Sequence, residues 1–449
     1  MPPFEYLNNH REEHLEQLLE WLRIPSVSAK SENDEDTRHA AEWLAERMRE
    51  AGLDAELIKT KKHPIVIGEW RKAKKAPTLL VYGHYDVQPA EPLDEWKSPP
   101  FEPAVRAGKL YARGSVDDKG QIFLHLKAVE AHLAENGKLP VNVVFVVEGE
   151  EEVGSPSLEH FLKDNKKRLA CDAVLISDTT MFAPKTPSIT VGLRGMAYME
   201  VRVKGPPSDL HSGSYGGAVA NPANALCKMV AALHDDEGRI AIPGFYDEVR
   251  TLSAQDRTAI RELPYEVRLR SEVGGALAGE ATYSALERVW IRPTLDLNGL
   301  FSGYTGEGAK TVLPAKATAK ISMRLVPDQQ YKDIEKKFTE HFKHLAPDGI
   351  EVEVKALHGG QPWHAEPEGP VFEAAKRALK RAFGKDPVLI REGGSIPIVG
   401  AFEEALEAPV VLIGFGLPGE NAHAPNEWIS VDNFHRGAEA IANLYEELA

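Results

Sequence analysis

The chain contains four short apolar runs, each followed by polar side chains. The runs cover residues 79–82, 141–147, 173–176 and 409–413. Runs of this length and composition are typical of strands in a parallel sheet that is buried on both faces. In such sheets, ligands bind beyond the carboxyl ends of the strands. The sequence therefore predicts an α/β sheet with its functional residues gathered along one edge.

The side chains that follow these runs are of the kind that binds divalent metals. They are imidazoles and carboxylates: His84, Asp86, Glu151, Glu152, Asp178 and His423. Asp117 adds a carboxylate in a loop that opens a helix, where it can bridge two cations. Mixed nitrogen and oxygen ligands suit Zn²⁺, Mn²⁺ or Co²⁺ rather than Ca²⁺. Two such ions about 3.5–4 Å apart form a known clamp for hydrolysis by water.

Spacing constrains the roles of two residue pairs. His84 and Asp86 are two residues apart, which places both side chains on the same face of a strand. A metal-bound imidazole needs its second nitrogen held by a carboxylate or carbonyl, so Asp86 is expected to orient His84 without binding the metal itself. Glu151 and Glu152 are adjacent and point in different directions. One of them can bind metal while the other takes a proton from water.

Each of these residues also has an ordinary explanation. A lone His after a strand is usually a surface or hydrogen-bonded residue. An Asp near a helix N-terminus is favoured by capping and by the helix dipole, and a run of Glu is normally a solvated loop. The metal interpretation rests on the joint occurrence of these side chains at successive strand ends.

Strand and helix patterns divide the chain into three segments. They alternate from residue 1 to about 185, return after Pro370, and indicate a layered α/β sheet. Between these parts, residues 198–203, 317–324 and 350–354 alternate with period two, as antiparallel strands with one solvated face do. We therefore predict an α/β domain over 1–189 and 359–449, interrupted by an α+β insertion over 190–358. The predicted helices are 11–23, 37–50, 119–135, 221–233, 333–345, 371–383 and 433–448.

Composition limits the partners and the location. A length of 449 residues favours two domains. The formal net charge of −15 argues against nucleic acid or an anionic membrane as a partner, because both need a basic face. The apolar runs are too short to span a bilayer. Two cysteines imply no disulfide framework, and the first residues form an amphipathic helix pattern rather than a secretory signal, which favours the cytoplasm.

Several segments resemble a known enzyme family. They occupy residues 83–89, 111–120, 150–155, 176–178, 209–213, 324–327, 392–397 and 421–427. In this order they resemble the di-metal dipeptidase and aminoacylase family of metallopeptidases, most of all its carnosine dipeptidase and cytosolic non-specific dipeptidase branch. The resemblance implies a layered mixed sheet with helices on both faces, of the di-zinc aminopeptidase type. It also implies that the insertion over 190–358 is a lid and dimerisation domain.

The resemblance implies a role for each candidate ligand. Asp117 bridges two metal ions, Zn²⁺ or Mn²⁺, in each subunit. His84 and Asp178 bind one ion, and Glu152 and His423 bind the other.

The resemblance also implies which residues take part in the reaction. Glu151 is the general base, and Asp86 supports His84. A water shared by two cations loses a proton readily. Glu151 takes that proton and returns it to the leaving amine after attack on the peptide carbonyl. In this family the peptide bond that follows the bridging residue, here Asp117–Asp118, is cis.

Five residues match positions that contact the substrate. His211 resembles a histidine that reaches in from the neighbouring subunit's lid and stabilises the oxyanion. Arg324 resembles the residue that binds the substrate's C-terminal carboxylate, a task suited to a planar guanidinium. Thr311, Gly394 and Ser395 match other contacting positions. From the residues alone, an ordinary exposed strand residue at 324 and a loop histidine at 211 are the alternatives.

The expected function is therefore hydrolysis of dipeptides or very short peptides by a cytoplasmic homodimer. The enzymatic alternative is an N-acyl amino acid amidohydrolase or a carboxypeptidase with the same centre, and a metal-dependent binding protein is the alternative from another class. Two other motifs fail in context. The G-x-G-x-x-G of residues 414–419 is interrupted by Pro418 where a phosphate site needs a helix. Residues 393–397 place Pro397 where a nucleophile elbow has its second glycine.

Overall fold

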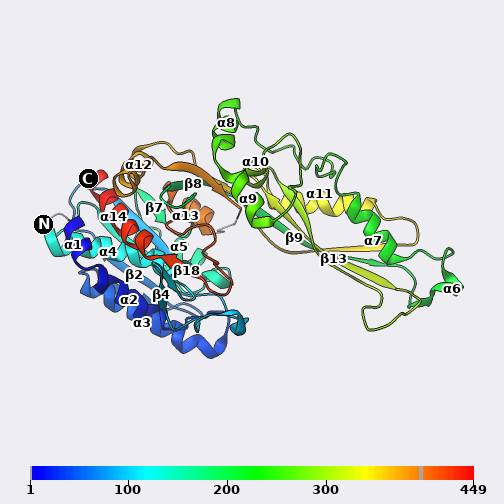
Figure 1. Ribbon diagram of the computed structural model, residues 1–449, viewed down its shortest axis with the longest axis horizontal. Helices are drawn as coiled ribbons and strands as arrows, with labels where there is room; N and C mark the ends of the chain where they lie inside the picture. The colour runs from blue at the N-terminus through cyan, green and yellow to red at the C-terminus, as the bar shows by residue number, and fades with distance from the viewer. Residues whose placement is uncertain (1–2, 394–397) are drawn as a thin grey trace. The chain divides into compact units, whose positions relative to one another are not determined.

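The structure, a computed structural model, describes residues 3–393 and 398–449 and divides into two compact units. Unit 1 comprises Met1–Val191, Ala365–Ile390 and Ile398–Ala449. Unit 2 comprises Gly192–His364 and a short segment that begins at Arg391. Figure 1 labels the helices and some of the strands of both units.

A nine-stranded mixed sheet, in the order β1-β2-β6-β3-β7-β17-β8-β15 with β16 paired to β8, supplies the core of unit 1. Strand β15 and the last two residues of β8 and of β16 fall within unit 2. The four apolar runs of the sequence are its parallel central strands β6, β3, β7 and β17, so their carboxyl ends meet at one edge. The strands are β1 (Asp54–Ile58), β2 (Ile65–Trp70), β3 (Thr78–His84), β6 (Asn142–Glu148), β7 (Ala173–Ile176), β8 (Ser188–Leu193), β15 (Trp363–His364), β16 (Val388–Glu392) and β17 (Val410–Leu412).

Helices cover both faces of this sheet, because successive strand residues point to opposite sides. Tyr82 of β3 packs edge-on against Phe402 of α13, with ring centroids 4.9 Å apart. The next residue, Gly83, faces Ile122 of α4, and a Cβ there would lie 2.9 Å from the Ile122 side chain. A residue without a side chain therefore lets α4 approach the strand closely. The helices of unit 1 are α1 (Pro3–Asn9), α2 (Arg11–Leu22), α3 (Asp34–Glu50), α4 (Lys119–Asn136), α5 (Leu158–Asn165), α12 (Pro370–Phe383), α13 (Ile398–Leu406) and α14 (Val431–Glu447).

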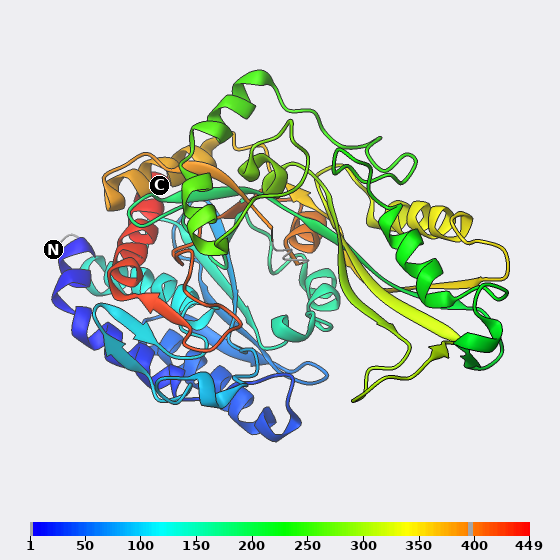
Figure 2. The ribbon, with the colours of Figure 1, turned by 45° about the vertical axis from the view of Figure 1, so that its right-hand side comes forward.

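Unit 2 is built on a four-stranded antiparallel sheet in the order β11-β13-β9-β14. Alternate residues of β9, among them Met199 and Val201, are buried in a core that α7 and α11 complete with Leu226 and Phe338. Figure 2 shows α7 (green) and α11 (yellow) beside this sheet. The strands are β9 (Gly195–Lys204), β10 (Leu210–His211), β11 (Thr294–Ser302), β12 (Val312–Leu313), β13 (Lys316–Leu325) and β14 (Glu351–Gly360). The helices are α6 (Ser212–Tyr215), α7 (Pro222–Ala231), α8 (Ala254–Glu262), α9 (Tyr265–Val273), α10 (Ala285–Trp290) and α11 (Tyr331–His344).

The predicted fold class, a layered mixed α/β sheet with an α+β lid, is confirmed. Every helix predicted by residue range is present within a few residues of its expected ends. The apolar runs indicated only the parallel strands, whereas the outer strands of the large sheet are antiparallel, as the resemblance to a mixed-sheet family implied. The helices outside the predicted ranges are α1, α5, α6, α8, α9, α10 and α13. In the part of the chain that the structure describes, no helix is both long and apolar enough to cross a membrane.

A buried histidine makes the stability of unit 1 sensitive to acid. His125 on α4 is buried, its Nε2 lies 2.7 Å from Ser177 Oγ, and burial lowers its pKa to about 3. In the unfolded chain the pKa of this histidine is about 6.5, so below that pH its side chain is protonated in the unfolded chain but stays neutral in the folded one. The free energy of unfolding should therefore fall by about 1.4 kcal/mol per pH unit between about pH 6 and pH 4 because of this group.

Urea unfolding of His125→Gln at several pH values checks this expectation. The variant should lose that part of the pH dependence, whereas His160→Gln, at an exposed position of α5, should retain it. If the free energy of unfolding changes equally with pH in the wild type and in both variants, His125 is not the cause.

Candidate metal centre

His84 presents one ring nitrogen to the edge of the sheet. It is the last residue of β3 and is fully buried. Its Nδ1 lies 3.0 Å from the backbone carbonyl oxygen of Asp86 and 3.5 Å from Asp86 Oδ1. An Nδ1 that donates to these oxygens leaves Nε2 free of a proton and able to bind a cation. Nε2 is buried and has no hydrogen-bond partner among the described residues.

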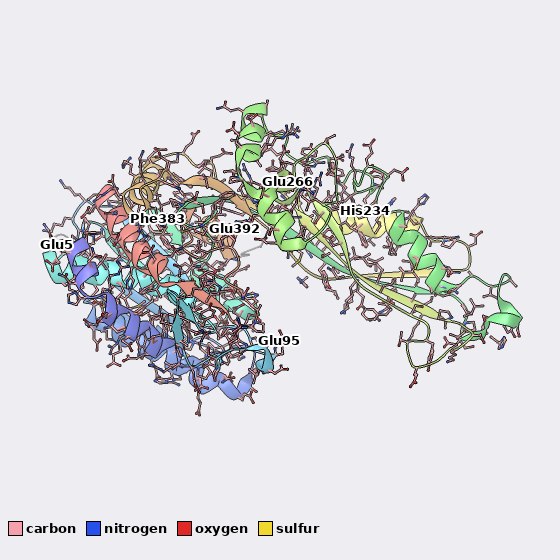
Figure 3. All side chains as sticks on the ribbon, viewed as in Figure 1. Glu5, Glu95, His234, Glu266, Phe383 and Glu392 are labelled. Carbon is pink, nitrogen blue, oxygen red and sulfur yellow. The ribbon has the colours of Figure 1, made fainter. Side chains whose placement is uncertain are left out.

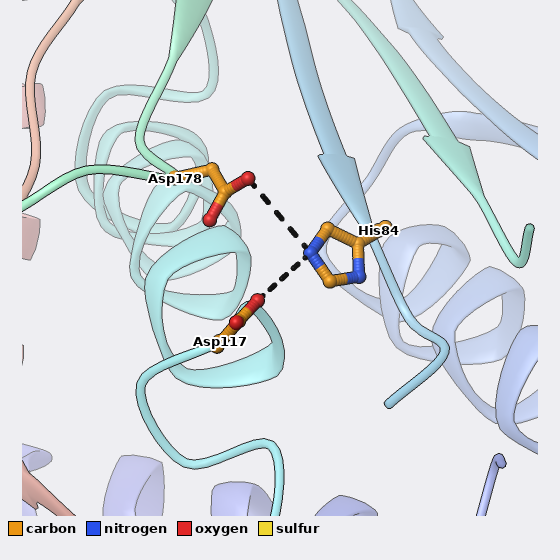
Figure 4. Close-up of side chains that lie close together, drawn as sticks. All are labelled: His84, Asp117 and Asp178. Carbon is orange, nitrogen blue, oxygen red and sulfur yellow. Dashed lines mark ion pairs between the residues drawn. The ribbon is translucent and has the colours of Figure 1, made fainter. Parts of the chain in front are cut away.

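The ring of His84 faces two carboxylates, as Figure 4 shows. Its Nε2 lies 3.1 Å from Asp117 Oδ1 and 4.0 Å from Asp178 Oδ2. Asp117 belongs to the loop before α4, and Asp178 follows β7. The ligand atoms of these three residues lie within 4.8 Å of one another, which is close enough to hold one metal ion.

A second group of three shares Asp117 with the first. Asp117 Oδ2 lies 2.8 Å from His423 Nε2, which in turn lies 3.4 Å from Glu152 Oε2. The ligand atoms of Asp117, Glu152 and His423 again lie within 4.8 Å of one another. One oxygen of Asp117 therefore faces each group, which is the arrangement of a carboxylate that bridges two cations.

Asp86 holds three parts of the site together. Besides facing His84, its carboxylate accepts hydrogen bonds from the backbone N–H groups of Glu151, at 3.3 Å, and Glu152, at 3.1 Å. Its Oδ2 also accepts from the hydroxyl of Ser28 at 2.6 Å. The sequence predicted only the contact with His84. In the structure Asp86 also fixes the turn that presents both glutamates.

A buried carboxylate holds the loop that carries Asp117. Glu427 accepts hydrogen bonds from the backbone N–H groups of Gly114, Val116 and Asp117 at 2.9–3.2 Å. It also accepts one from Arg113 Nη1 at 2.7 Å. Sequence reasoning gave Glu427 no role, although it ends one of the segments that carry the resemblance. The Asp117–Asp118 peptide bond is cis, as the resemblance implies.

Electrostatic coupling perturbs the acids and imidazoles of the site. Burial would raise the pKa of Asp117, but the imidazoles of His423 and His84 outweigh it and hold that pKa well below its usual range. The carboxylates of Asp117 and Glu152 raise the pKa of His423 to about 10. Burial raises the pKa of Glu151 to about 7; His84 opposes the shift and neighbouring carboxylates add to it.

The residues of the site fit divalent cations. Glu151 and the carboxylates of the two groups face only two imidazoles, so negative charge is in excess. Burial and the charges of Asp117 and Asp118 raise the pKa of Asp178 well above its ordinary value. Glu152 Oε1 is buried without a hydrogen-bond partner in the described chain. Unpartnered buried ligand atoms and clustered acids are what a bound cation would satisfy.

The predicted substrate residues that the structure describes lie in unit 2. His211 ends β10, which pairs with β12, and the carbonyl oxygen of Thr311 accepts from Ser212 N. His211 Nδ1 accepts a hydrogen bond from Gly213 N at 3.1 Å. A neutral ring of this kind carries its proton on Nε2 and can donate it. Arg324 is half-buried on β13. Gly394 and Ser395 lie outside the described residues.

Three comparisons with known proteins agree. The sequence model of "Peptidase family M20/M25/M40" matches residues 80–447. The Cys-Gly metallodipeptidase dug1 of Schizosaccharomyces pombe is 33% identical, over 99% of this chain and 98% of its own length. The Beta-Ala-His dipeptidase of Homo sapiens is 32% identical, over 99% and 92%.

Solved structures show the same likeness. Human carnosine dipeptidase 1 is similar with a TM-score of 0.83 and 31% identity, covering 99% of this chain and 98% of that one. The M20 family metallo-carboxypeptidase Sso-CP2 from Sulfolobus solfataricus is similar with a TM-score of 0.85 and 34% identity, covering 97% and 99%.

Proposed function

Because the chain belongs to peptidase family M20/M25/M40, a family of metal-dependent hydrolases, we propose that it is a dipeptidase with two divalent cations in each subunit. The observation that carries the proposal is the pair of ligand groups that share Asp117. Relatives named as dipeptidases, similar along nearly the whole chain, support the choice of substrate.

Each residue of the centre has a proposed place. His84 and Asp178 would hold one cation, Glu152 and His423 the other, and Asp117 both. Mixed imidazole and carboxylate ligands favour Zn²⁺ or Mn²⁺, with Co²⁺ as a further candidate. When bound, such cations polarise the substrate carbonyl and lower the pKa of water.

Glu151 would move the proton. Its backbone is held by Asp86, and it belongs to neither ligand group, so its side chain is free for proton transfer. A pKa of about 7 suits a group that accepts a proton from water and then releases it to the leaving amine. Asp86 would act as a positioning residue for both His84 and Glu151.

Unit 2 would supply the substrate contacts. Arg324 would bind the C-terminal carboxylate, and Thr311, Gly394 and Ser395 would contact the remaining parts of the peptide. His211 would donate from Nε2 to the oxyanion in the active site of the partner subunit, which makes the active form a homodimer. We place this enzyme in the cytoplasm.

A carboxypeptidase is the second candidate. The similarity to Sso-CP2, at 34% identity over nearly the full length, favours it specifically. A carboxypeptidase accepts a longer chain on the amine side of the scissile bond, as an amidohydrolase accepts an acyl group there. A dipeptidase requires a free amine.

One assay separates these functions. The protein is stripped of metal, reloaded with Mn²⁺ or Zn²⁺, and given free dipeptides, N-acetyl dipeptides, N-acetyl amino acids and longer peptides. Metal-dependent cleavage of the free dipeptides alone supports the proposal. Preference for blocked or longer substrates would instead indicate an amidohydrolase or a carboxypeptidase. If none of the substrates is hydrolysed by the metal-loaded protein, a metal-dependent binding protein would be indicated.

Substitution of His211 by alanine should lower kcat far more than it raises KM. The oxyanion exists chiefly in the transition state, so its donor contributes there. Loss of one such donor costs about 10²–10³-fold in kcat. A variant with raised KM and normal kcat would rule out the oxyanion role.

Mixed dimers test which subunit supplies His211 to each active site. When Glu151→Gln and His211→Ala subunits exchange at equal amounts, half of the dimers contain one site with both residues intact. Recovery of about one quarter of the wild-type activity is therefore expected from isologous dimers. No recovery, despite proven subunit exchange, would place His211 in its own subunit's site.

A further inference from the structure

Arg194 of unit 2 is a buried cation that the proposed function does not use. It lies between β8 and β9 and is 7% exposed. Its guanidinium donates to the carbonyl oxygen of Val289 at 3.1 Å and to Thr294 Oγ1 at 2.9 Å. Both acceptors are uncharged, and Nε has no hydrogen-bond partner among the described residues. A buried guanidinium without a bonded carboxylate is costly unless an anion compensates its charge.

Arg194 is connected to Arg324 through one residue. Thr294, which accepts from Arg194, lies directly opposite Arg324 where β11 pairs with β13. Burial and the positive charge of Arg324 lower the pKa of Arg194 to about 10. The carboxylate of Asp296, which accepts from Thr294 Oγ1 at 3.1 Å, offsets only part of this repulsion. Two neighbouring cations thus share one acidic group.

Arg194 also holds the segment that leads to position 394. Its backbone N–H donates to the carbonyl oxygen of Glu392 at 3.2 Å, and Glu392 ends β16 (Figure 3). A Cβ placed on Gly393 would lie 3.9 Å from Arg194 Nη1. One arginine therefore contacts both the strand opposite Arg324 and the residues before Gly394.

We propose that Arg194 is a positioning and specificity residue for the substrate carboxylate: it fixes β11 beside Arg324 and adds a second positive charge. This inference rests on the proposed function, in which Arg324 binds that carboxylate. A pair of cations with only one carboxylate between them attracts an anion more strongly than either cation alone. The site should consequently discriminate sharply between a free carboxylate and a neutral C-terminal amide.

The test compares a dipeptide with its C-terminal amide. The KM of the dipeptide is measured directly, and the inhibition constant of the amide is measured with the amide as a competitor. Arg194→Met should raise the KM for the dipeptide by about tenfold or more, the worth of a lost charge interaction. The kcat and the inhibition constant of the amide should stay within about twofold of wild type.

Two further variants separate charge from geometry. Arg194→Lys retains the charge but not the planar fork and should give an intermediate KM. Thr294→Val removes the side-chain acceptor of Arg194 on β11 and should shift KM in the same direction. Arg288→Met is the matched control, because Arg288 also donates to backbone carbonyls, those of Glu280 and Ala278, in unit 2. It should leave both constants unchanged.

Arg194→Met is also combined with Arg324→Gln in a double variant. If both arginines act on one carboxylate, the double variant should raise the KM for the dipeptide by less than the product of the two single increases. Equal losses for dipeptide and amide, an unchanged KM, or a loss confined to kcat would overturn the inference. Failure of the wild-type protein to cleave any dipeptide would instead overturn the proposed function.

Discussion

Replacement of Glu151 by glutamine is expected to reduce kcat by about 10²–10⁴-fold, the usual contribution of a general base. The amide has nearly the same size and cannot accept the proton from water. The backbone N–H of residue 151 would still donate to Asp86, so the turn should keep its shape. Metal content should remain at the wild-type level, because Glu151 belongs to neither ligand group.

The neighbouring residue is the matched control. Glu152 accepts from Gln88 Nε2 at 2.7 Å and lies in the second ligand group. Glu152→Gln should lose both its metal and its activity, whereas Glu151→Gln should lose activity but keep its metal. Turnover and metal content of both purified variants decide the matter. An unchanged kcat in Glu151→Gln, or a loss of metal equal to that in Glu152→Gln, would exclude the assigned role.

The sequence predicted the parts of the site that follow from strand topology. His84 and Asp178 were expected together because they lie at the carboxyl ends of two strands, β3 and β7, that proved to be parallel and adjacent. The same argument predicted His423, which lies beyond the end of β17. The sharing of Asp117 between two ligand groups did not follow from spacing. The loop position showed only that such a bridge was feasible. The family resemblance assigned it, because the sharing depends on where two oxygens of one side chain point.

The supporting residues could not be predicted in the same way. Glu427 acts on backbone N–H groups that lie more than 300 positions earlier in the chain, and no local pattern marks such a contact. Ser28 reaches Asp86 from a loop before α3. Helix α9 buries none of its side chains, so it lacks the apolar period from which helices are recognised. Tertiary contacts rather than local preference place these groups.

Replacement of Asp117 by asparagine should remove both cations. Its two oxygens face the two ligand groups, so loss of the charge weakens both. Asp178→Asn is the matched control, because Asp178 belongs to the first group alone. Metal content is measured by elemental analysis after dialysis. Asp178→Asn should keep one cation per subunit, and Asp117→Asn should keep almost none.

The effect of Asp117→Asn on turnover should be among the largest of any substitution. Removal of both cations takes away several kcal/mol of transition-state stabilisation, and each 1.4 kcal/mol is about a tenfold change in rate. A fall in kcat/KM of about 10⁴-fold or more is therefore expected, and excess Mn²⁺ or Zn²⁺ should restore little of it. If Asp117→Asn kept two tightly bound cations, the carboxylate would not be their shared ligand. Loss of a single cation would mean that only one of its oxygens binds metal.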